Sequence, residues 1–121
     1  MTTEDKCRQN ATGEPWRLAK ELYRVERAGE RPEYLGGSQA FWRWLWNEIN
    51  KAHALASRSP KKARHYASVN RETLDNHPGL APSVAIGLRL KGQLWIDAAT
   101  AEEERLGVDA QGQCDIFRRV S

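Results

Sequence analysis

The chain has 121 residues, of which 40% are hydrophobic and 29% are charged, and its net charge at pH 7 is +3. A chain of this length is one domain that can bury a core without disulfides or metals, and the composition is typical of a globular protein. No apolar run approaches the roughly 18 residues of a membrane span, and the acidic start over residues 1–6 is not that of a secretory signal peptide. We therefore expect a cytoplasmic protein that does not enter membranes.

The chain begins with a polar stretch and then a helical pattern. Residues 1–13 carry no periodic apolar pattern, so we expect a flexible N-terminal tail ahead of a single globular domain over residues 14–121. A helix is predicted from Glu14-Pro15, because proline is favoured at the first helical position, to a stop at Gly29. One half of its wheel is apolar and comprises Trp16, Leu18, Ala19, Leu22, Tyr23 and Val25.

The second predicted helix holds three of the five tryptophans, and we expect it to be the centre of the fold. Ser38 is its predicted N-cap, and it runs to about Ser57. Its inward arc comprises Phe41, Trp42, Leu45, Trp46, Ile49, Ala52, His53 and Ala56. At this position His53 is interpreted as a hydrogen-bonded core histidine. Trp44 lies beyond one edge of the arc, so it is either buried beneath the C-terminal half or exposed to a base or a protein partner.

A third helix is predicted to begin at Pro60, with Ser59 as its N-cap, and to end before the turn over residues 76–79. Beyond Pro82 two interpretations compete. Strict apolar alternation over residues 84–90, a turn at Lys91-Gly92 and the run 93–96 indicate a β-hairpin, whereas the spacing of Val84, Leu88, Lys91 and Trp95 also suits a helix. We favour the hairpin, followed by a short helix over 98–106 that ends at Gly107 and a strand from Cys114 to Val120.

Together these elements predict an α+β fold that is mainly α. The three amphipathic helices are organised around the tryptophan-rich one over residues 39–57. A small β-hairpin, a short helix and a C-terminal strand close the domain. This order of elements resembles that of winged-helix DNA-binding proteins, although no residue motif carries the resemblance. The resemblance implies that the third helix is the recognition helix and that residues 84–96 are the wing.

No recognisable catalytic signature is present. Cys7 and Cys114 form no C-x-x-C pair, and three histidines spaced twelve residues apart do not match a metal site within one helix or turn. Gly36-Gly37 precedes a helix but lacks the lysine of a P-loop. We therefore expect a non-enzymatic protein that needs no metal and no cofactor.

Charge is distributed unevenly along the chain. Residues 58–91 carry seven Lys or Arg against two acids, whereas residues 97–109 carry five acids against one Arg. Such a basic segment favours an anionic partner, although the two segments are equally able to face each other. The predicted nucleic-acid-binding residues are Lys61, Lys62, Arg64, His65 and Arg71 on the third helix and Arg17, Lys20, Arg24 and Arg27 on the first.

The sequence thus favours a small bacterial nucleic-acid-binding protein, with DNA as the expected ligand and phosphate contacts as the source of affinity. Two alternatives stay open: the basic faces are ordinary solvated helix surfaces, or the chain is a protein-interaction or inhibitor module. In that case Trp44 and the acidic residues 102–104 contact a protein partner, or the tryptophan-rich helix pairs with a second copy of the chain to form a homodimer.

Overall fold

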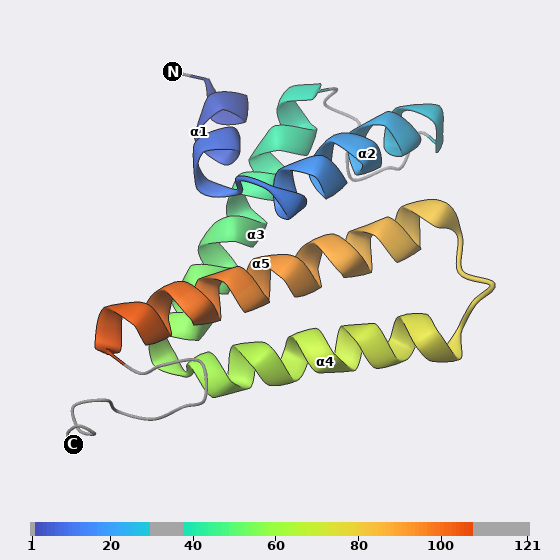
Figure 1. The fold of residues 1–121 in the computed structure, drawn as a ribbon. Helices are drawn as coiled ribbons and strands as arrows, with labels where there is room; N and C mark the ends of the chain where they lie inside the picture. Colours follow the sequence, from blue (N-terminus) through green and yellow to red (C-terminus); the bar gives the residue numbers. More distant parts are fainter. Residues whose placement is uncertain (1, 30–37, 108–121) are drawn as a thin grey trace.

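The computed structural model describes residues 2–29 and 38–107, and these residues form five α-helices and no strand (Figure 1). The helices are α1 (Thr3–Asn10), α2 (Glu14–Gly29), α3 (Ser38–Arg58), α4 (Pro60–Asn76) and α5 (Pro82–Leu106). None of them combines the length and the apolar character that crossing a bilayer requires. The fold over the described residues is therefore all-α, and the predicted α+β class is wrong.

The helix boundaries follow from local chemistry at their ends. The Ser59 hydroxyl accepts a hydrogen bond from the backbone N–H of Lys62 at 3.1 Å, and Pro60 occupies the first turn of α4, as predicted. At the end of α5, Gly107 adopts the left-handed conformation with φ of 78°, which glycine reaches at no steric cost. The predicted range of the first helix matches α2, and the predicted second helix matches α3 to within one residue.

The predicted hairpin is the main error, because residues 82–106 form one continuous helix. Ile86, Leu90, Leu94 and Ala98 recur every four residues and form its buried row. Gly92, the expected turn residue, is buried in mid-helix, and the expected helix over 98–106 is only the last part of α5. Since residues 84–96 are helical, there is no wing in the described chain, and the resemblance to winged-helix proteins does not hold. The expected strand at 114–120 lies outside the described residues.

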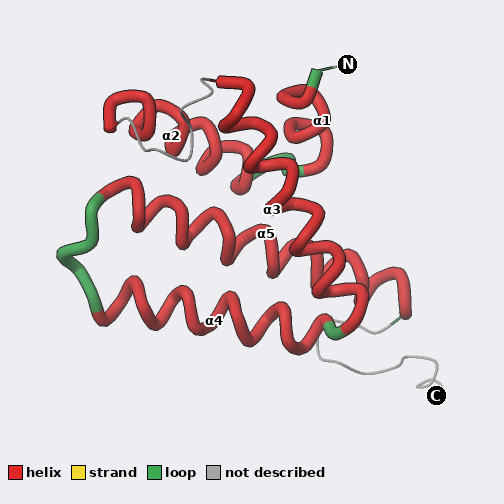
Figure 2. The backbone as a smooth tube through the Cα atoms, turned by 180° about the vertical axis from the view of Figure 1, so that it is seen from behind, coloured by secondary structure: helices red, strands yellow, loops and turns green. Residues whose placement is uncertain are grey.

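Helix α5 lies at the centre of the arrangement. It packs against α4 on one side and α2 on the other, and α3 crosses it (Figures 1 and 2). A helix that contacts three others needs apolar residues on several sides, so its sequence lacks one narrow apolar stripe. A side-chain hydrogen bond from Asn70 of α4 to the Leu88 carbonyl, at 3.1 Å, fixes the two helices relative to each other. The tryptophan-rich helix α3 therefore shares the centre of the fold with α5.

The aromatic residues of α3 and α2 pack together in the upper half of the fold. Phe41 and Trp42 are buried and meet edge to face, with ring centroids 4.8 Å apart. Trp46, which was expected in the core with Trp42, is half-buried and has the Lys6 ammonium 5.9 Å from its ring centroid. Trp42 is thus the tryptophan of this cluster that the core encloses.

The N-terminal segment is a packed helix, in place of the expected flexible tail. Thr2 and Asp5 form a reciprocal capping box at the start of α1, and α1 packs against α3. Cys7 is fully buried at this contact, and its thiol donates to the Trp42 carbonyl at 3.4 Å. Burial raises the pKa of the Cys7 thiol to about 11, with the nearby Glu4 carboxylate adding to the shift. The polar sequence concealed this docking because only Cys7 of α1 is buried.

Candidate nucleic-acid interface

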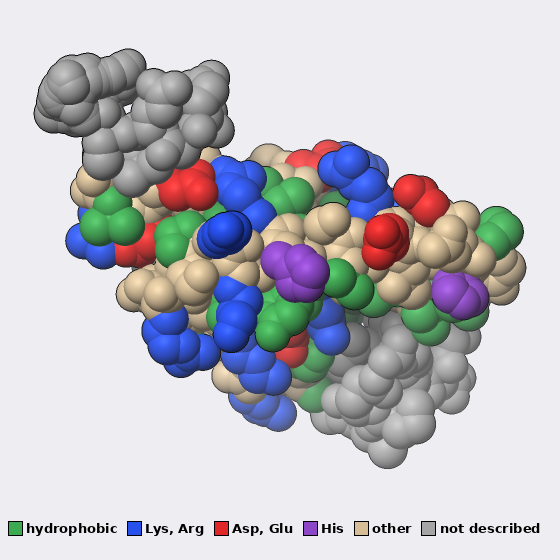
Figure 3. All heavy atoms as spheres, turned by 90° about the horizontal axis from the view of Figure 1, so that it is seen from below, with side chains coloured by type: hydrophobic (Ala, Val, Ile, Leu, Met, Phe, Trp, Pro, Cys, Tyr) green, Lys and Arg blue, Asp and Glu red, His purple; other side chains and the backbone are tan. Residues whose placement is uncertain are grey.

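The solvent-exposed side of α4 carries a group of cations, in which Lys61 lies centrally while Lys62 and Arg71, nine residues apart, lie at opposite edges. Lys61, Lys62 and Arg71 are exposed, and none of them forms an ion pair with any residue in the described ranges 2–29 and 38–107. His65 lies on the same face, and Glu72 is the acid among them. Figure 3 views the molecule from below and shows a group of Lys and Arg side chains beside a histidine on this side. We call Lys61, Lys62, His65 and Arg71 the α4 cationic surface.

Arg64 does not belong to this surface, although its sequence position predicts it. Its guanidinium donates to both carboxylate oxygens of Glu103 on α5, at 2.8 and 3.1 Å, and to the Thr100 hydroxyl at 2.9 Å. The hydrogen bonds from Arg64 hold the pKa of Glu103 below its usual value, and the same contacts raise the pKa of Arg64. The basic and acidic segments therefore face each other at this point, which the charge distribution left open.

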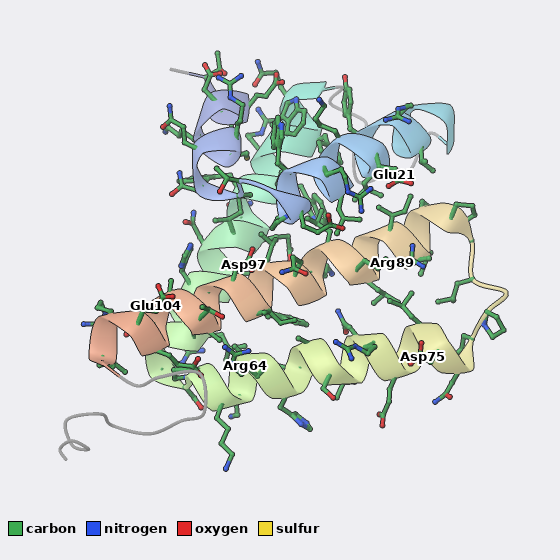
Figure 4. The ribbon with its side chains drawn as sticks, in the orientation of Figure 1. Glu21, Arg64, Asp75, Arg89, Asp97 and Glu104 are labelled. Atoms are coloured by element: carbon green, nitrogen blue, oxygen red, sulfur yellow. The ribbon has the colours of Figure 1, made fainter. Side chains whose placement is uncertain are left out.

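A groove of about 570 Å³ runs between α4 and α5 next to the cationic surface. Arg71 and Asp75 line it from α4, and Arg89 lines it from α5. Figure 4 shows Arg64 and Asp75 toward opposite ends of α4, with Arg89 on the facing stretch of α5. Arg89 was not predicted as a lining residue because the hairpin prediction placed it in a strand. A helical interpretation of residues 82–106 would have placed it on a helix that packs beside α4.

The basic stripe predicted on the first helix is divided in the folded protein. Arg17 forms ion pairs with Glu14 and Glu21 of the same helix. Lys20 and Arg24 are exposed and line a different groove, between α1 and α2. These two residues belong to α2, which lies on the opposite side of α5 from α4 (Figure 1), and the side chain of Arg27 lies outside the described residues. The two predicted basic faces therefore do not form one surface.

The residues of the alternative function are largely engaged within the protein. Trp44 is half-buried, packs against the core and lies 5.7 Å from the Phe41 ring between centroids. In the acidic segment, Glu103 pairs with Arg64 and Glu102 pairs with Arg105, while Glu104 is exposed. A basic partner protein would have to compete with both internal pairs.

His53 is exposed, so its interpretation as a core histidine is wrong. It lines a groove with Ala52 of the same helix and with Asp97 and Glu104 of α5. Within residues 2–29 and 38–107, no cluster of three His, Cys, Asp or Glu side chains has the arrangement of a metal site. The chain matches no protein-family model, no curated protein and no solved structure.

Proposed function

We propose that this protein binds nucleic acid without catalysing a reaction on it, and that DNA phosphates contact the α4 cationic surface. The observation that carries the proposal is the exposure of Lys61, Lys62 and Arg71 without ion-pair partners among the described residues. An unpaired surface cation keeps its full charge for a ligand, whereas Arg64 would first have to give up Glu103.

The spacing of these cations suits a phosphate backbone. Lys61 and Arg71 are ten residues apart, which is about 15 Å along an α-helix. Phosphates follow one another at about 3.4 Å per strand along the axis of B-DNA, so the surface spans about four phosphate steps. Lysine ammonium groups contact such phosphates as point charges, and Arg71 adds a planar donor that can bind two oxygens.

The test is a binding titration with labelled duplex DNA and RNA, followed by fluorescence anisotropy over a salt series beginning at about 50 mM. Three phosphate contacts predict a slope of about −3 in log K against log salt concentration, because each contributes about −0.9. The double substitution Lys61→Gln with Lys62→Gln should reduce this slope by about two. The relative affinities for DNA and RNA decide the expected preference for DNA.

The matched control is Arg43→Gln, which removes one exposed and unpaired cation from α3 and leaves α4 intact. This variant should retain the slope of the unmodified protein to within a few tenths. An absence of binding to DNA and to RNA at the lowest salt concentration would refute the proposal. A loss in the single Arg43 variant that is half the loss in the double lysine variant would assign the binding to net charge and not to α4.

A further inference from the structure

A second groove, of about 660 Å³, lies between α1 and α2 and combines aromatic rings with cations. Trp16 and Tyr23 of α2 each stack on Trp42, with centroid separations of 5.3 Å in each pair and interplanar angles of 27° and 29°. Trp16 ends this stack, and its one ring contact among the described residues is with Trp42. Trp16 is half-buried, so part of its indole faces the groove.

Positive charge follows Trp16 along the same side of α2. Trp16, Lys20 and Arg24 recur every four residues, so their side chains form one row with a rise of about 6 Å per step. Lys20 and Arg24 are exposed and form no ion pair within the described part of the chain. From α1, Arg8 and Glu4 complete the lining, and Arg8 is paired with Asp5 at 2.8 Å.

We propose that this groove binds a nucleotide, with its base stacked on Trp16 and its phosphate held by Lys20 and Arg24. Stacking on an aromatic ring stabilises the binding of any base. The phosphate is attracted by two adjacent cations, and its negative charge also reduces the repulsion between them. Lys20 and Arg24 follow Trp16 at about 6 and 12 Å along the helix axis, so a ligand that stacks on the indole can extend along the row toward both cations. The Glu4 carboxylate is an acceptor for hydroxyl or amino groups of the ligand.

The groove is lined from α1, α2 and α3, and α2 lies across α5 from α4 (Figure 1), so the site does not depend on the function proposed above. The same chemistry is present in a free mononucleotide and in a nucleotide at the end of a single strand. The test therefore uses AMP, adenosine, inorganic phosphate and a 5′-phosphorylated adenine oligonucleotide of four residues as separate ligands. Binding is followed by NMR through the indole N–H signals of the five tryptophans, with the Trp16 signal assigned by its loss in Trp16→Leu.

AMP should shift the Trp16 indole signal saturably, adenosine should bind at least about fivefold more weakly, and phosphate alone should not shift it. The double substitution Lys20→Gln with Arg24→Gln should weaken AMP binding about tenfold and leave adenosine binding unchanged. Both substituted residues are exposed, so the fold should be retained. If the oligonucleotide binds and AMP does not, and if Lys20→Gln with Arg24→Gln weakens oligonucleotide binding about tenfold, the ligand is a nucleotide within a strand.

The control variant is Lys61→Gln with Lys62→Gln, which should bind AMP as the unmodified protein does. No shift of the Trp16 signal by AMP or by the oligonucleotide at millimolar concentration would overturn the proposal. AMP binding that is unaffected by Lys20→Gln with Arg24→Gln would overturn it equally. If this control variant loses duplex DNA binding and still binds AMP, the two sites are independent, and the nucleotide site stands whatever the outcome for the α4 cationic surface.

Discussion

Arg64 of α4 and Glu103 of α5 form a two-point ion pair between residues 39 positions apart, with N···O distances of 2.8 and 3.1 Å. Their side chains are 42% and 20% exposed, so the pair lies at the surface, where it stabilises the fold by less than about 1 kcal/mol. The larger effect of the pair is on whether Arg64 can bind a ligand. A guanidinium whose donors already bind a carboxylate is less available to a phosphate.

Release of Arg64 should therefore strengthen nucleic-acid binding. We expect Glu103→Gln to raise the affinity for DNA and to increase the magnitude of the salt slope by up to about one, because Arg64 then adds one phosphate contact. Arg64→Ala should change the slope by much less than substitution of Lys61. Anisotropy titration over the same salt series measures both effects.

The matched control for this prediction is Glu102→Gln. It removes an equal charge from the adjacent residue, but its partner is Arg105 of the same helix. If Glu102→Gln and Glu103→Gln raise the affinity equally, the change comes from net charge and the Arg64 pair has no masking effect.

The first and last residues of the helices could be predicted from the sequence where capping residues, prolines and glycines mark them. Ser59 with Pro60 fixes the start of α4, and Gly107 fixes the end of α5, because these residue types have one favoured geometry at helix ends. Between the ends of α5, apolar alternation over residues 84–90 fits a strand as well as a helix that is buried on several sides. Contacts with three other helices decided the outcome, and local sequence does not contain them.

The candidate site shows the same division. The exposure of Lys61 follows from its position opposite Ala63 on the helical wheel, so it could be predicted from the sequence. The engagement of Arg64 depends on Thr100 and Glu103, which a predicted hairpin would have placed elsewhere. The aromatic stack with Trp16 joins α2 to α3 and likewise required the fold.

The helical state of residues 82–106 predicts that Gly92→Ala stabilises the protein. The new Cβ would meet the Ala67 carbonyl oxygen and the Asn70 Cβ at 3.9 Å, which is ordinary van der Waals contact. Alanine is favoured over glycine within a helix by about 0.5–1 kcal/mol, and we expect a gain of this size in the free energy of unfolding. Urea denaturation measures it. Gly87→Ala, where the Cβ meets nothing within 4 Å, is the reference, and a loss of stability in Gly92→Ala together with a gain in Gly87→Ala would indicate a turn at Gly92.

The Ser59 cap predicts a loss of stability in Ser59→Ala. The backbone N–H of Lys62 would lose its acceptor at 3.1 Å, and such a loss costs about 1 kcal/mol. Ser59→Asp should restore most of the stability, because a carboxylate is an equally good cap and suits the positive end of the helix. Thermal unfolding by circular dichroism compares the three proteins. Equal stability of the alanine variant and the unmodified chain would contradict a role for the cap.

The buried thiol of Cys7 predicts a loss of stability at high pH. Its pKa is about 11 in the folded protein against a usual value of 9.0, so the unfolded chain releases its proton first. Stability is therefore complete below about pH 9 and falls as the pH rises toward 11, by up to about 2 kcal/mol. Urea denaturation at several pH values measures the decline in a Cys114→Ser background.

Cys7→Ala in that background should show a shallower decline over the same pH range, because other titrating groups are unchanged. The thiol should also react with a maleimide reagent only after unfolding, since Cys7 is fully buried. Rapid labelling of the folded protein would show that α1 leaves its position against α3.

The central place of α5 has a consequence for how the chain acquires its structure during synthesis. Helices α2 and α4 have their main contacts with α5 and meet each other little, yet both precede it along the chain. Until residues 82–106 have emerged from the ribosome, α2 and α4 lack the helix against which each mainly packs. The nascent chain therefore exposes the apolar faces of α2 and α4 until α5 has been synthesised, and aggregation at that stage is the risk that this order of helices creates.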